Sequence, residues 1–511
     1  SSKLSSSLWG SCFGQSLSGG LDVKTESVTD GYKITLTPVS GALNLTQACT
    51  LMYDLNTSQI LKARAGGDDG YAHNVIISSM TIDGVNTPIN STCAATGCKD
   101  PGNGYVNAGY YAQWAVWDRE YNPNSLPFAS INDIIYAFIG FDKDTGNLAS
   151  LDGNADSWSI PVVSKAILQN PYMHAHLSFG GWTNNQVNTA PMFLKLSSSQ
   201  ASMQNFATQA VALMKKTKFS GLDIDWEWWS EPEQAPAKQM LSFYKILRAE
   251  LDKAGATDGK HYTLTIAVNA GVDRVNAMQD PSNPNSVADY WKQVNTLVDQ
   301  INLMSYDYHG AYDNSKPAYF HANYDFANIP LDKQADVGQT SGWSIKAVVA
   351  AYQANGITAK KLVLGLPAYA RTMSVSGGTN GGLLQAVRGA GFGDYEAGVL
   401  DYKCLVNPVA DKANGCKNVS AGLSDLVFYN SKATGTALSA FNTYGRDAMQ
   451  PWAYSPSTNT FVTFDDTWSV TAKTKVAKDS GLGGMMFWEL DGDSNTPQLS
   501  LIKAVKDELN R

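Results

Sequence analysis

The chain is organised around residues 219–229, which read FSGLDIDWEWW. Asp223, Asp225 and Glu227 follow one another at two-residue spacing in this stretch, and apolar residues separate them. A period of two is typical of a β-strand, whose successive side chains point to opposite faces. We therefore predict a strand that carries all three carboxylates on one face, with roughly 6–7 Å between neighbours.

Three acids on one half-buried face change one another's protonation. Like charges and burial both disfavour the carboxylate form, so some of these groups are expected to hold a proton near neutral pH. Such a separation of pKa values provides one site with both an acid and a base. The alternative is an edge strand with a solvated acidic face. The tryptophans crowded into the same stretch and the preceding Gly221 argue against that alternative.

The composition describes a well-packed globular protein. Hydrophobic residues make up 43% of the 511 residues and charged residues only 16%, which is not the composition of a disordered chain. The net charge of −8, without a cluster of Lys and Arg, argues against a nucleic-acid partner. No apolar run is long enough to cross a bilayer, so no membrane partner is expected. The 24 tyrosines and 13 tryptophans suit a groove that stacks on sugar faces, although aromatic rings mostly fill cores.

The cysteines indicate disulfides and an oxidising destination. Two local pairs close short loops and a further two cysteines lie in the first hundred residues: Cys93 with Cys98, Cys404 with Cys416, and Cys12 and Cys49. None has the C-x-x-C spacing of a zinc or redox site, so we predict no metal and no cofactor. Buried free thiols are the alternative. Disulfides persist outside the reducing cytosol, and we therefore predict a secreted protein.

The first hundred residues differ in texture from the rest. Residues 1–100 hold short alternating segments such as YKITLTP and NVIISSMTIDG, which Gly, Asn, Asp and Ser separate. This spacing predicts a small all-β domain with a sandwich-like fold. Its role is left open among substrate anchoring, docking of an unknown protein partner and simple packing. A Gly-rich boundary follows it, so we expect the catalytic domain to occupy residues 101–511.

After this boundary, apolar strands alternate with helical patterns. Eight segments are expected to be strands: VNAGYY (106–111), DIIYAFIGF (133–141), HAHLSFGGW (174–182), SGLDIDWE (220–227), TLTIAVNAG (263–271), QINLMSYDY (300–308), KLVLGLPAYA (361–370) and GLGGMMFWEL (481–490). Eight β/α units predict a TIM barrel, whose active site lies at the C-terminal ends of the strands. A doubly wound open sheet is the alternative, but the phosphate-binding glycine fingerprint of that fold is missing. The gap before the eighth strand is too long for one helix, which predicts an α+β insertion over residues 373–455.

SGLDIDWE (220–227) is similar to the D-G-x-D-x-D-x-E signature of glycoside hydrolase family 18, the chitinases. Four further segments resemble motifs of that family in the same order: LSFGG (177–181), MSYD (304–307), GLPAYAR (365–371) and FWELDGD (487–493). The 373–455 insertion resembles that of the bacterial-type chitinases with deeper clefts. The resemblance covers about residues 105–510. It departs from the signature at Ser220, where the family has its first Asp.

The resemblance implies hydrolysis of β-1,4 bonds between N-acetylglucosamine units of chitin, with net retention. Glu227 would donate the proton to the leaving oxygen, and the substrate's own acetamido oxygen would attack the sugar. Asp225 would orient the acetamido N–H and offset the positive charge of the intermediate. Asp223 would share a proton with Asp225, and Tyr110 and Ser178 would hydrogen-bond this inner carboxylate.

The resemblance also implies a set of residues that contact the sugars. Tyr306 would hold the acetamido group, with Met304 and Asp307 beside it. Arg371 and Tyr369 would bind sugar hydroxyls. The aromatic contacts would be Trp488 as the floor under the distorted sugar, and Trp182, Trp228 and Tyr312 as stacking platforms for neighbouring units.

Two other functions are compatible with the same groove. A chitinase-like lectin keeps the barrel but usually lacks the terminal acid, which is present here as Glu227. An endo-β-N-acetylglucosaminidase that acts on N-glycans generally lacks the large insertion before the eighth strand. The chitinase hypothesis therefore ranks first, with chitin and chito-oligosaccharides as the expected partners.

Overall fold

The computed structural model describes residues 99–228, 234–326, 328–406, 416, 421–430 and 443–511, together with eight strands of the first 98 residues. The chain divides into two compact units. One unit comprises Ser1–Lys99, Gln113–Ala129 and Asp152–Met173, and the other comprises Asp100–Ala112, Ser130–Leu151 and His174–Arg511.

Eight parallel strands in the second unit form the barrel: β9 (Val106–Ala112), β10 (Asp133–Phe141), β12 (His174–Gly180), β15 (Gly221–Asp225), β16 (Thr263–Asn269), β17 (Gln300–Met304), β18 (Leu362–Pro367) and β25 (Gly484–Trp488). Each strand pairs with the next in this order, and β9 pairs with both β25 and β10, so the barrel is closed. Every residue of β10 and β18 is buried, because a parallel strand is covered on both faces. The predicted TIM barrel is confirmed, and the open sheet is excluded.

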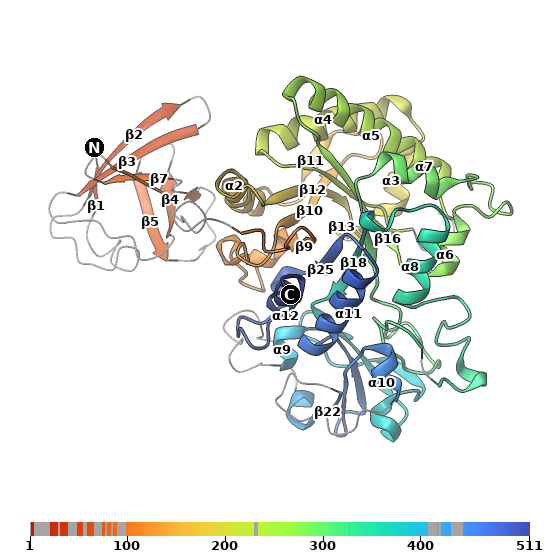
Figure 1. The fold of residues 1–511 in the computed structure, drawn as a ribbon. Helices are drawn as coiled ribbons and strands as arrows, with labels where there is room; N and C mark the ends of the chain where they lie inside the picture. The colour runs from red at the N-terminus through yellow and green to blue at the C-terminus, as the bar shows by residue number, and fades with distance from the viewer. Residues whose placement is uncertain are drawn as a thin grey trace. The chain divides into compact units, whose positions relative to one another are not determined.

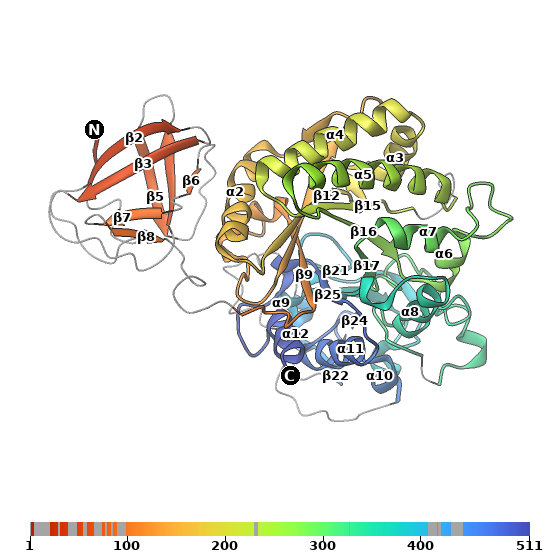
Figure 2. The ribbon, with the colours of Figure 1, turned by 45° about the horizontal axis from the view of Figure 1, so that its top comes forward.

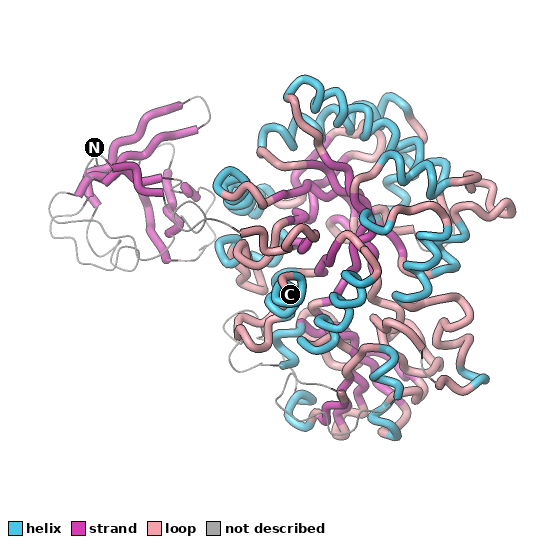
Figure 3. Tube along the Cα trace, viewed as in Figure 1, coloured by secondary structure: helices cyan, strands magenta, loops and turns pink. Residues whose placement is uncertain are grey.

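Helices surround the barrel strands, as the tube in Figure 3 shows. In chain order they are α3 (Thr189–Ser197), α4 (Gln200–Thr217), α5 (Ala237–Asp258), α6 (Val272–Ala277), α7 (Tyr290–Leu297), α8 (Ile345–Ala354), α11 (Thr467–Asp479) and α12 (Leu501–Leu509). Helix α2 (Gly153–Gln169) belongs to the other unit. Helix α4 illustrates their origin, because its buried residues recur with helical period and Ser199 caps its first turn. Three short strands lie in the connections: β11 (Leu148–Ser150), which pairs with β10, and β13 (Thr183–Asn184) and β14 (Val187–Asn188), which pair with each other.

A second sheet lies between the seventh and eighth barrel strands. It is antiparallel and contains β19 (Tyr369–Val375), β20 (Val387–Ala390), β21 (Val399–Asp401), β22 (Val427–Tyr429), β23 (Trp452–Ser455) and β24 (Thr460–Thr463), with α9 (Tyr402–Val406) and α10 (Thr443–Ala448) in its connections. Figure 1 shows this sheet at the bottom of the ribbon, below the barrel. The α+β insertion is therefore present, and its first strand begins two residues after β18 ends. The domain boundaries 373–455 and 101–511 stay predictions.

The strands of the first 98 residues pair only antiparallel with one another. They are β1 (Ser2–Leu4), β2 (Leu21–Val28), β3 (Gly31–Pro38), β4 (Cys49–Asp54), β5 (Gln59–Ala65), β6 (Asn74–Ile76), β7 (Ser79–Ile82) and β8 (Val85–Pro88), shown in red and orange in Figure 2. The predicted segment YKITLTP lies in β3, and NVIISSMTIDG contains β6 and β7. The sandwich-like domain 1–100 stays a prediction. Bonds of the side chains of Cys12, Cys49, Cys93 and Cys98 lie outside the described residues.

Candidate active site

Asp223 is the innermost of the three strand acids and is fully buried. Its Oδ2 accepts hydrogen bonds from the Tyr110 hydroxyl at 2.9 Å and the Ser178 hydroxyl at 2.7 Å. Its Oδ1 accepts one from the Thr265 hydroxyl at 2.5 Å. Ser178, Asp223 and Thr265 are register partners on β12, β15 and β16, which explains why they meet. Burial raises the pKa of Asp223, and these hydroxyls oppose that effect by stabilising the carboxylate.

Asp225 occupies the next position on the same face and is also buried, with 3% of its surface exposed. Its Oδ1 has no hydrogen-bond partner among the residues that the structure describes. Burial raises its pKa well above the usual range, and the charges of Glu227 and Asp223 raise it further. Because of this environment, Asp225 holds a proton more readily than Asp223 does.

Glu227 lies two residues beyond the end of β15 and is partly exposed. The prediction that the strand carries all three acids therefore holds for Asp223 and Asp225, whereas Glu227 follows in an irregular segment. Burial raises the pKa of Glu227 to about 8, with a further contribution from the charge of Asp307. A carboxyl group with this pKa is protonated at neutral pH and is able to act as a general acid.

Asp307 lies after β17 and anchors one wall of the site, with a left-handed φ of 60°. Its Oδ1 accepts hydrogen bonds from Tyr369 Oη at 2.6 Å and from Arg371 Nε at 2.8 Å. Burial opposes its charge, but Arg371 and the contact with His321 together outweigh burial and hold the pKa of Asp307 far below its usual value. The Tyr312 hydroxyl donates to the Asp307 carbonyl oxygen at 2.5 Å. Tyr369 and Arg371 belong to β19, so the insertion contributes directly to this wall.

Aromatic rings gather around Trp488 at the end of β25, and we call this group the floor of the site. The Trp488 ring stacks on Phe138 with 5.9 Å between ring centres and contacts Tyr110 at 5.2 Å. Tyr306 and Tyr110 are buried in the same apolar cluster, and Met304 packs against it. The cluster therefore joins the floor to Tyr110, whose hydroxyl binds Asp223.

The three predicted stacking platforms differ in exposure. Trp182 is 51% exposed and Tyr312 is 55% exposed, so both present a ring to solvent. Trp228 is only 7% exposed, and the guanidinium of Arg274 lies 5.5 Å from its ring centre. With Trp226 it lines a small pocket against residues of α5 and α7. The observed packing contradicts the stacking role predicted for Trp228, because its ring is buried and not available to a sugar.

Three residues of the site were not predicted from the sequence: Thr265, Phe138 and His321. The Asp307 N–H donates to His321 Nδ1 at 3.2 Å, so this nitrogen is an acceptor. Burial lowers the pKa of His321, which agrees with a neutral ring. The alternation in TLTIAVN (263–269) did indicate an inward threonine, but only the strand register reveals its partner.

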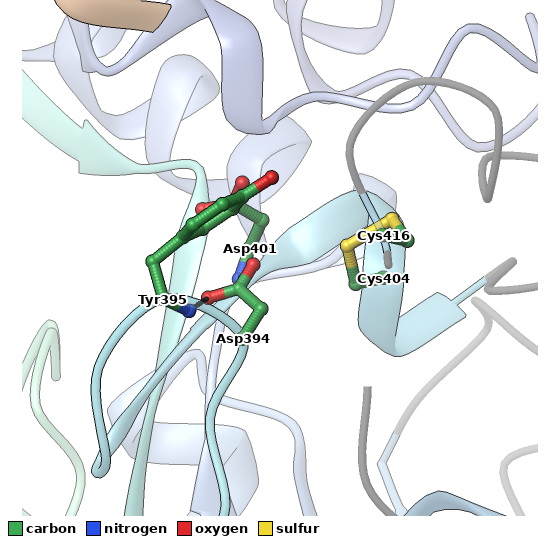
Figure 4. Close-up of a disulfide and its surroundings, with 5 residues drawn as sticks. All are labelled: Asp394, Tyr395, Asp401, Cys404 and Cys416. Carbon is green, nitrogen blue, oxygen red and sulfur yellow. Dashed lines mark hydrogen bonds between the residues drawn. A yellow bond between two sulfur atoms is a disulfide. The ribbon is translucent and has the colours of Figure 1, made fainter. Parts of the chain in front are cut away.

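One group of potential metal ligands occurs in the described residues, outside the site. Oxygen atoms of Asp394 and Asp401 and the sulfur of Cys404 lie within 4.8 Å of one another. Cys404 forms the predicted disulfide with Cys416, as Figure 4 shows, so its sulfur is not a thiolate. Asp394 instead accepts the backbone N–H groups of Tyr395 and Asp401. We therefore assign this cluster to the packing of the insertion.

None of the described helices combines the length and apolar character needed to cross a membrane.

Comparisons with known proteins agree with this geometry. The model of "Glycosyl hydrolases family 18" matches residues 106–493. Chitinase 1 of Aphanocladium album is 30% identical over 434 residues, which cover 81% of this chain and 87% of that protein. Endochitinase 1 of Metarhizium robertsii is 30% identical over 457 residues, which cover 85% of this chain and 92% of that protein. Chitinase A1 of Niallia circulans is 27% identical over 454 residues, which cover 78% of this chain and 58% of that protein.

Solved structures share the fold. The group IV chitinase of Ostrinia furnacalis, in complex with allosamidin, superposes with a TM-score of 0.64 at 22% identity over 80% of this chain and 99% of that one. A mutant of the class V chitinase of Nicotiana tobaccum, in complex with NAG4, superposes with a TM-score of 0.61 at 19% identity. The match covers 80% of this chain and 99% of that one. The ordered motifs, the closed barrel and the family match agree: the chain belongs to the glycosyl hydrolases of family 18.

Proposed function

We propose that this family 18 glycosyl hydrolase is a chitinase that cleaves β-1,4 bonds between N-acetylglucosamine units by substrate-assisted, retaining catalysis. One observation carries the proposal: three acids of one strand end have three different environments. Hydroxyl groups stabilise Asp223 as a carboxylate, Asp225 is buried with no partner for Oδ1 among the described residues, and Glu227 has a pKa of about 8. The names of the relatives, which are chitinases, support the choice of substrate.

In the first step, Glu227 donates its proton to the glycosidic oxygen. The bond between this oxygen and C1 breaks, and its electron pair stays on the leaving sugar. The acetamido oxygen of the same sugar forms a bond to C1 from the opposite face, which gives a cyclic oxazolinium ion. Asp225 accepts a hydrogen bond from the acetamido N–H and offsets the positive charge, because its proton moves toward Asp223.

In the second step, water attacks C1 while Glu227, now a carboxylate, takes a proton from it. The bond between C1 and the acetamido oxygen breaks, which restores the amide. Two inversions at C1 give net retention. Family 18 is an exception to the rule that relates carboxylate separation to stereochemistry, because no second carboxylate attacks the sugar.

The remaining residues bind and distort the substrate. Tyr306 holds the acetamido group, and Met304 packs beside it. Asp307 lies beside this acetamido site, and Arg371 and Tyr369, which hydrogen-bond its carboxylate, bind sugar hydroxyls. Trp488 supports the distorted sugar, and the exposed rings of Trp182 and Tyr312 stack on neighbouring units.

We also propose that the protein is secreted, because the Cys404–Cys416 disulfide requires an oxidising environment. The relatives include proteins from Metarhizium and from Niallia, so the bacterial-type assignment stays a prediction.

Glu227→Gln tests the proposal with chitotetraose as substrate. The amide keeps the size of the side chain but has no proton to donate, so kcat is expected to fall by about 1,000-fold. The dissociation constant, measured by calorimetry, is expected to change less than about threefold, because ground-state binding is retained. The exposed Glu396→Gln serves as a matched control and keeps full activity.

Two outcomes would overturn the proposal. Binding of chitotetraose by the unaltered chain without shorter products would indicate a lectin. Release of intact glycans from a glycoprotein, with chitin untouched, would indicate an endo-β-N-acetylglucosaminidase.

A further inference from the structure

A buried histidine lies inside the barrel, beneath the three acids. His176 is 3% exposed, and the mechanism above does not use it. Its Nδ1 lies 2.8 Å from Asp133 Oδ1, and its Nε2 lies 2.5 Å from Thr263 Oγ1. Asp133, His176 and Thr263 belong to β10, β12 and β16, so the chain of contacts crosses four barrel strands.

Gly221 allows this contact between strands that are not neighbours. His176 is the register partner of Gly221 on β15, and Gly221 is the register partner of Thr263 on β16. A Cβ atom on Gly221 would lie 2.4 Å from Thr263 Oγ1 and 2.1 Å from the Thr263 carbonyl oxygen. Only a glycine at this position therefore leaves room for the imidazole to reach Thr263.

We assign the protons of His176 from the hydrogen bonds of its neighbours. The Asp133 carboxylate accepts a hydrogen bond from Nδ1–H. The Thr263 hydroxyl donates to the Ser220 carbonyl oxygen at 3.3 Å, so its oxygen accepts from Nε2. Both ring nitrogens are then donors, which only the imidazolium allows. Burial disfavours this charge, but the carboxylates around the ring, Asp133 foremost and then Asp223 and Asp299, together outweigh burial and raise the pKa of His176.

The imidazolium lies one layer below Asp223. Ser178, Asp223 and Thr265 form the next register layer after His176, Gly221 and Thr263. A two-residue step along a strand is roughly 7 Å, which sets the scale of the separation. Asp133 is on β10, one strand farther from β15, so the positive end of the ion pair is nearer to Asp223.

We propose that His176 is a positioning residue, whose charge keeps Asp223 ionised so that the proton of the acid pair rests on Asp225. This inference rests on the proposed function, because it assigns the proton that the substrate-assisted step moves. In this arrangement a neutral Asp225 faces the acetamido group of the substrate, and the Asp223 carboxylate beneath it is able to take up the proton of Asp225.

Other titratable groups face this layer. Asp299 acts on His176 from the turn before β17, but Arg248 binds its carboxylate at 3.0 Å and His261 binds it at 2.6 Å. Tyr110, Tyr244 and Tyr306 approach the acids from β9, α5 and the end of β17, and burial raises the pKa of all three well above neutral pH. His176 is therefore the one cation among the groups that act most strongly on Asp223 in the described residues.

His176→Gln tests the inference through the pH profile of kcat/KM on chitotetraose. The acidic limb reports the second protonation of the Asp223–Asp225 pair, as a macroscopic value. Loss of the cation is expected to move this limb to higher pH by about one unit. The basic limb, which reports Glu227 two layers farther away, is expected to move much less.

His174→Gln is the matched control, because it removes an exposed histidine from the same strand. A charge-retaining variant, His176→Lys, is expected to keep the acidic limb near its original position. A folded His176→Gln protein that loses activity equally at every pH, with an unshifted limb, would overturn the inference.

Two further outcomes keep the test decisive. If His176→Gln does not fold, ring ¹⁵N spectra of the unaltered chain decide: a histidine that is still doubly protonated at pH 8 supports the inference, and its absence overturns it. If the unaltered chain does not hydrolyse chitotetraose, the proposed function fails, whereas an unshifted limb in an active enzyme rejects only the role of His176.

Discussion

The three carboxylates of FSGLDIDWEWW are chemically almost identical, and their surroundings make them different. Asp223 has three hydroxyl donors, one buried oxygen of Asp225 has no partner in the part of the chain that the structure describes, and Glu227 is partly exposed and feels the charge of Asp307. Desolvation and neighbouring charge therefore assign base and acid roles along only five residues.

The basic limb of the pH profile belongs to Glu227. Because this residue must be protonated to act as an acid, kcat/KM is expected to fall as pH rises through about 8. Asp307→Asn removes a negative charge that raises the pKa of Glu227, and leaves Arg371 without its counter-charge. Both effects favour the Glu227 carboxylate, so the basic limb is expected to move to lower pH by about one unit.

The exposed Asp332→Asn is the control for this change and is expected to leave the limb in place. Burial, the main cause of the raised pKa, persists in the Asp307 variant, so the limb is not expected to return fully to the value of a free glutamate. A basic limb that stays at its original pH would show that Asp307 does not act on Glu227.

At the scale of the element, the end of β12 fixes the position of the inner acids. Gly180 is the register partner of Asp225 and has a left-handed φ of 115°. A Cβ atom there would lie 2.0 Å from the Asp225 carbonyl oxygen. Gly180→Ala therefore combines backbone strain with displacement of Asp225, and we expect a loss of about 2–3 kcal/mol in the free energy of unfolding.

Gly153→Ala is the matched control for this prediction. Nothing lies within 4 Å of a Cβ atom at Gly153, and the residue begins helix α2. Its effect on stability is expected to stay within about 0.5 kcal/mol. Urea unfolding of both variants checks the prediction, and equal stability of the two would refute the role of the close contact at Gly180.

The sequence predicts elements well where each strand is a continuous apolar run. All eight barrel strands lie within the predicted segments or extend one residue beyond them, because strands covered on both faces leave this pattern. The ends of the strands were less predictable. Strand β15 stops at Asp225, although the alternation of apolar and acidic residues continues to Glu227. Trp228 looked like a stacking platform, but its packing against Arg274 depends on a helix far along the chain.

Side-chain contacts between different strands were also difficult to predict from the sequence. Thr265 and His176 reach their partners across the barrel, and no local pattern encodes the register that brings them there. Tyr110 and Ser178 were placed beside Asp223 through resemblance to the family, and both hydrogen bonds are present. Their effect on the rate stays a prediction.

At the scale of the molecule, the site is assembled from distant segments. In sequence, the residues of the proposed site run from Tyr110 to Trp488, and the closure of β9 against β25 brings these two rings together. The insertion adds Arg371 and Tyr369, so it is part of the wall and not only an appendage.

Removal of residues 1–98 tests whether the first segment takes part in catalysis. No residue of the proposed machinery lies in that segment. The kcat/KM for chitotetraose is therefore expected to stay within about threefold of the value for the full chain. A tenfold or larger loss in a folded protein would place part of the machinery in the first 98 residues.

The stereochemistry of cleavage tests the central claim most directly. If the two carboxylates are separated by about one extended two-residue step, roughly 7 Å, their distance is one that predicts inversion in two-carboxylate glycosidases. Attack by the substrate's own acetamide predicts retention instead. Proton NMR of the first products released from chitohexaose distinguishes them: the β-anomer is expected to form first, and initial formation of the α-anomer would contradict the mechanism.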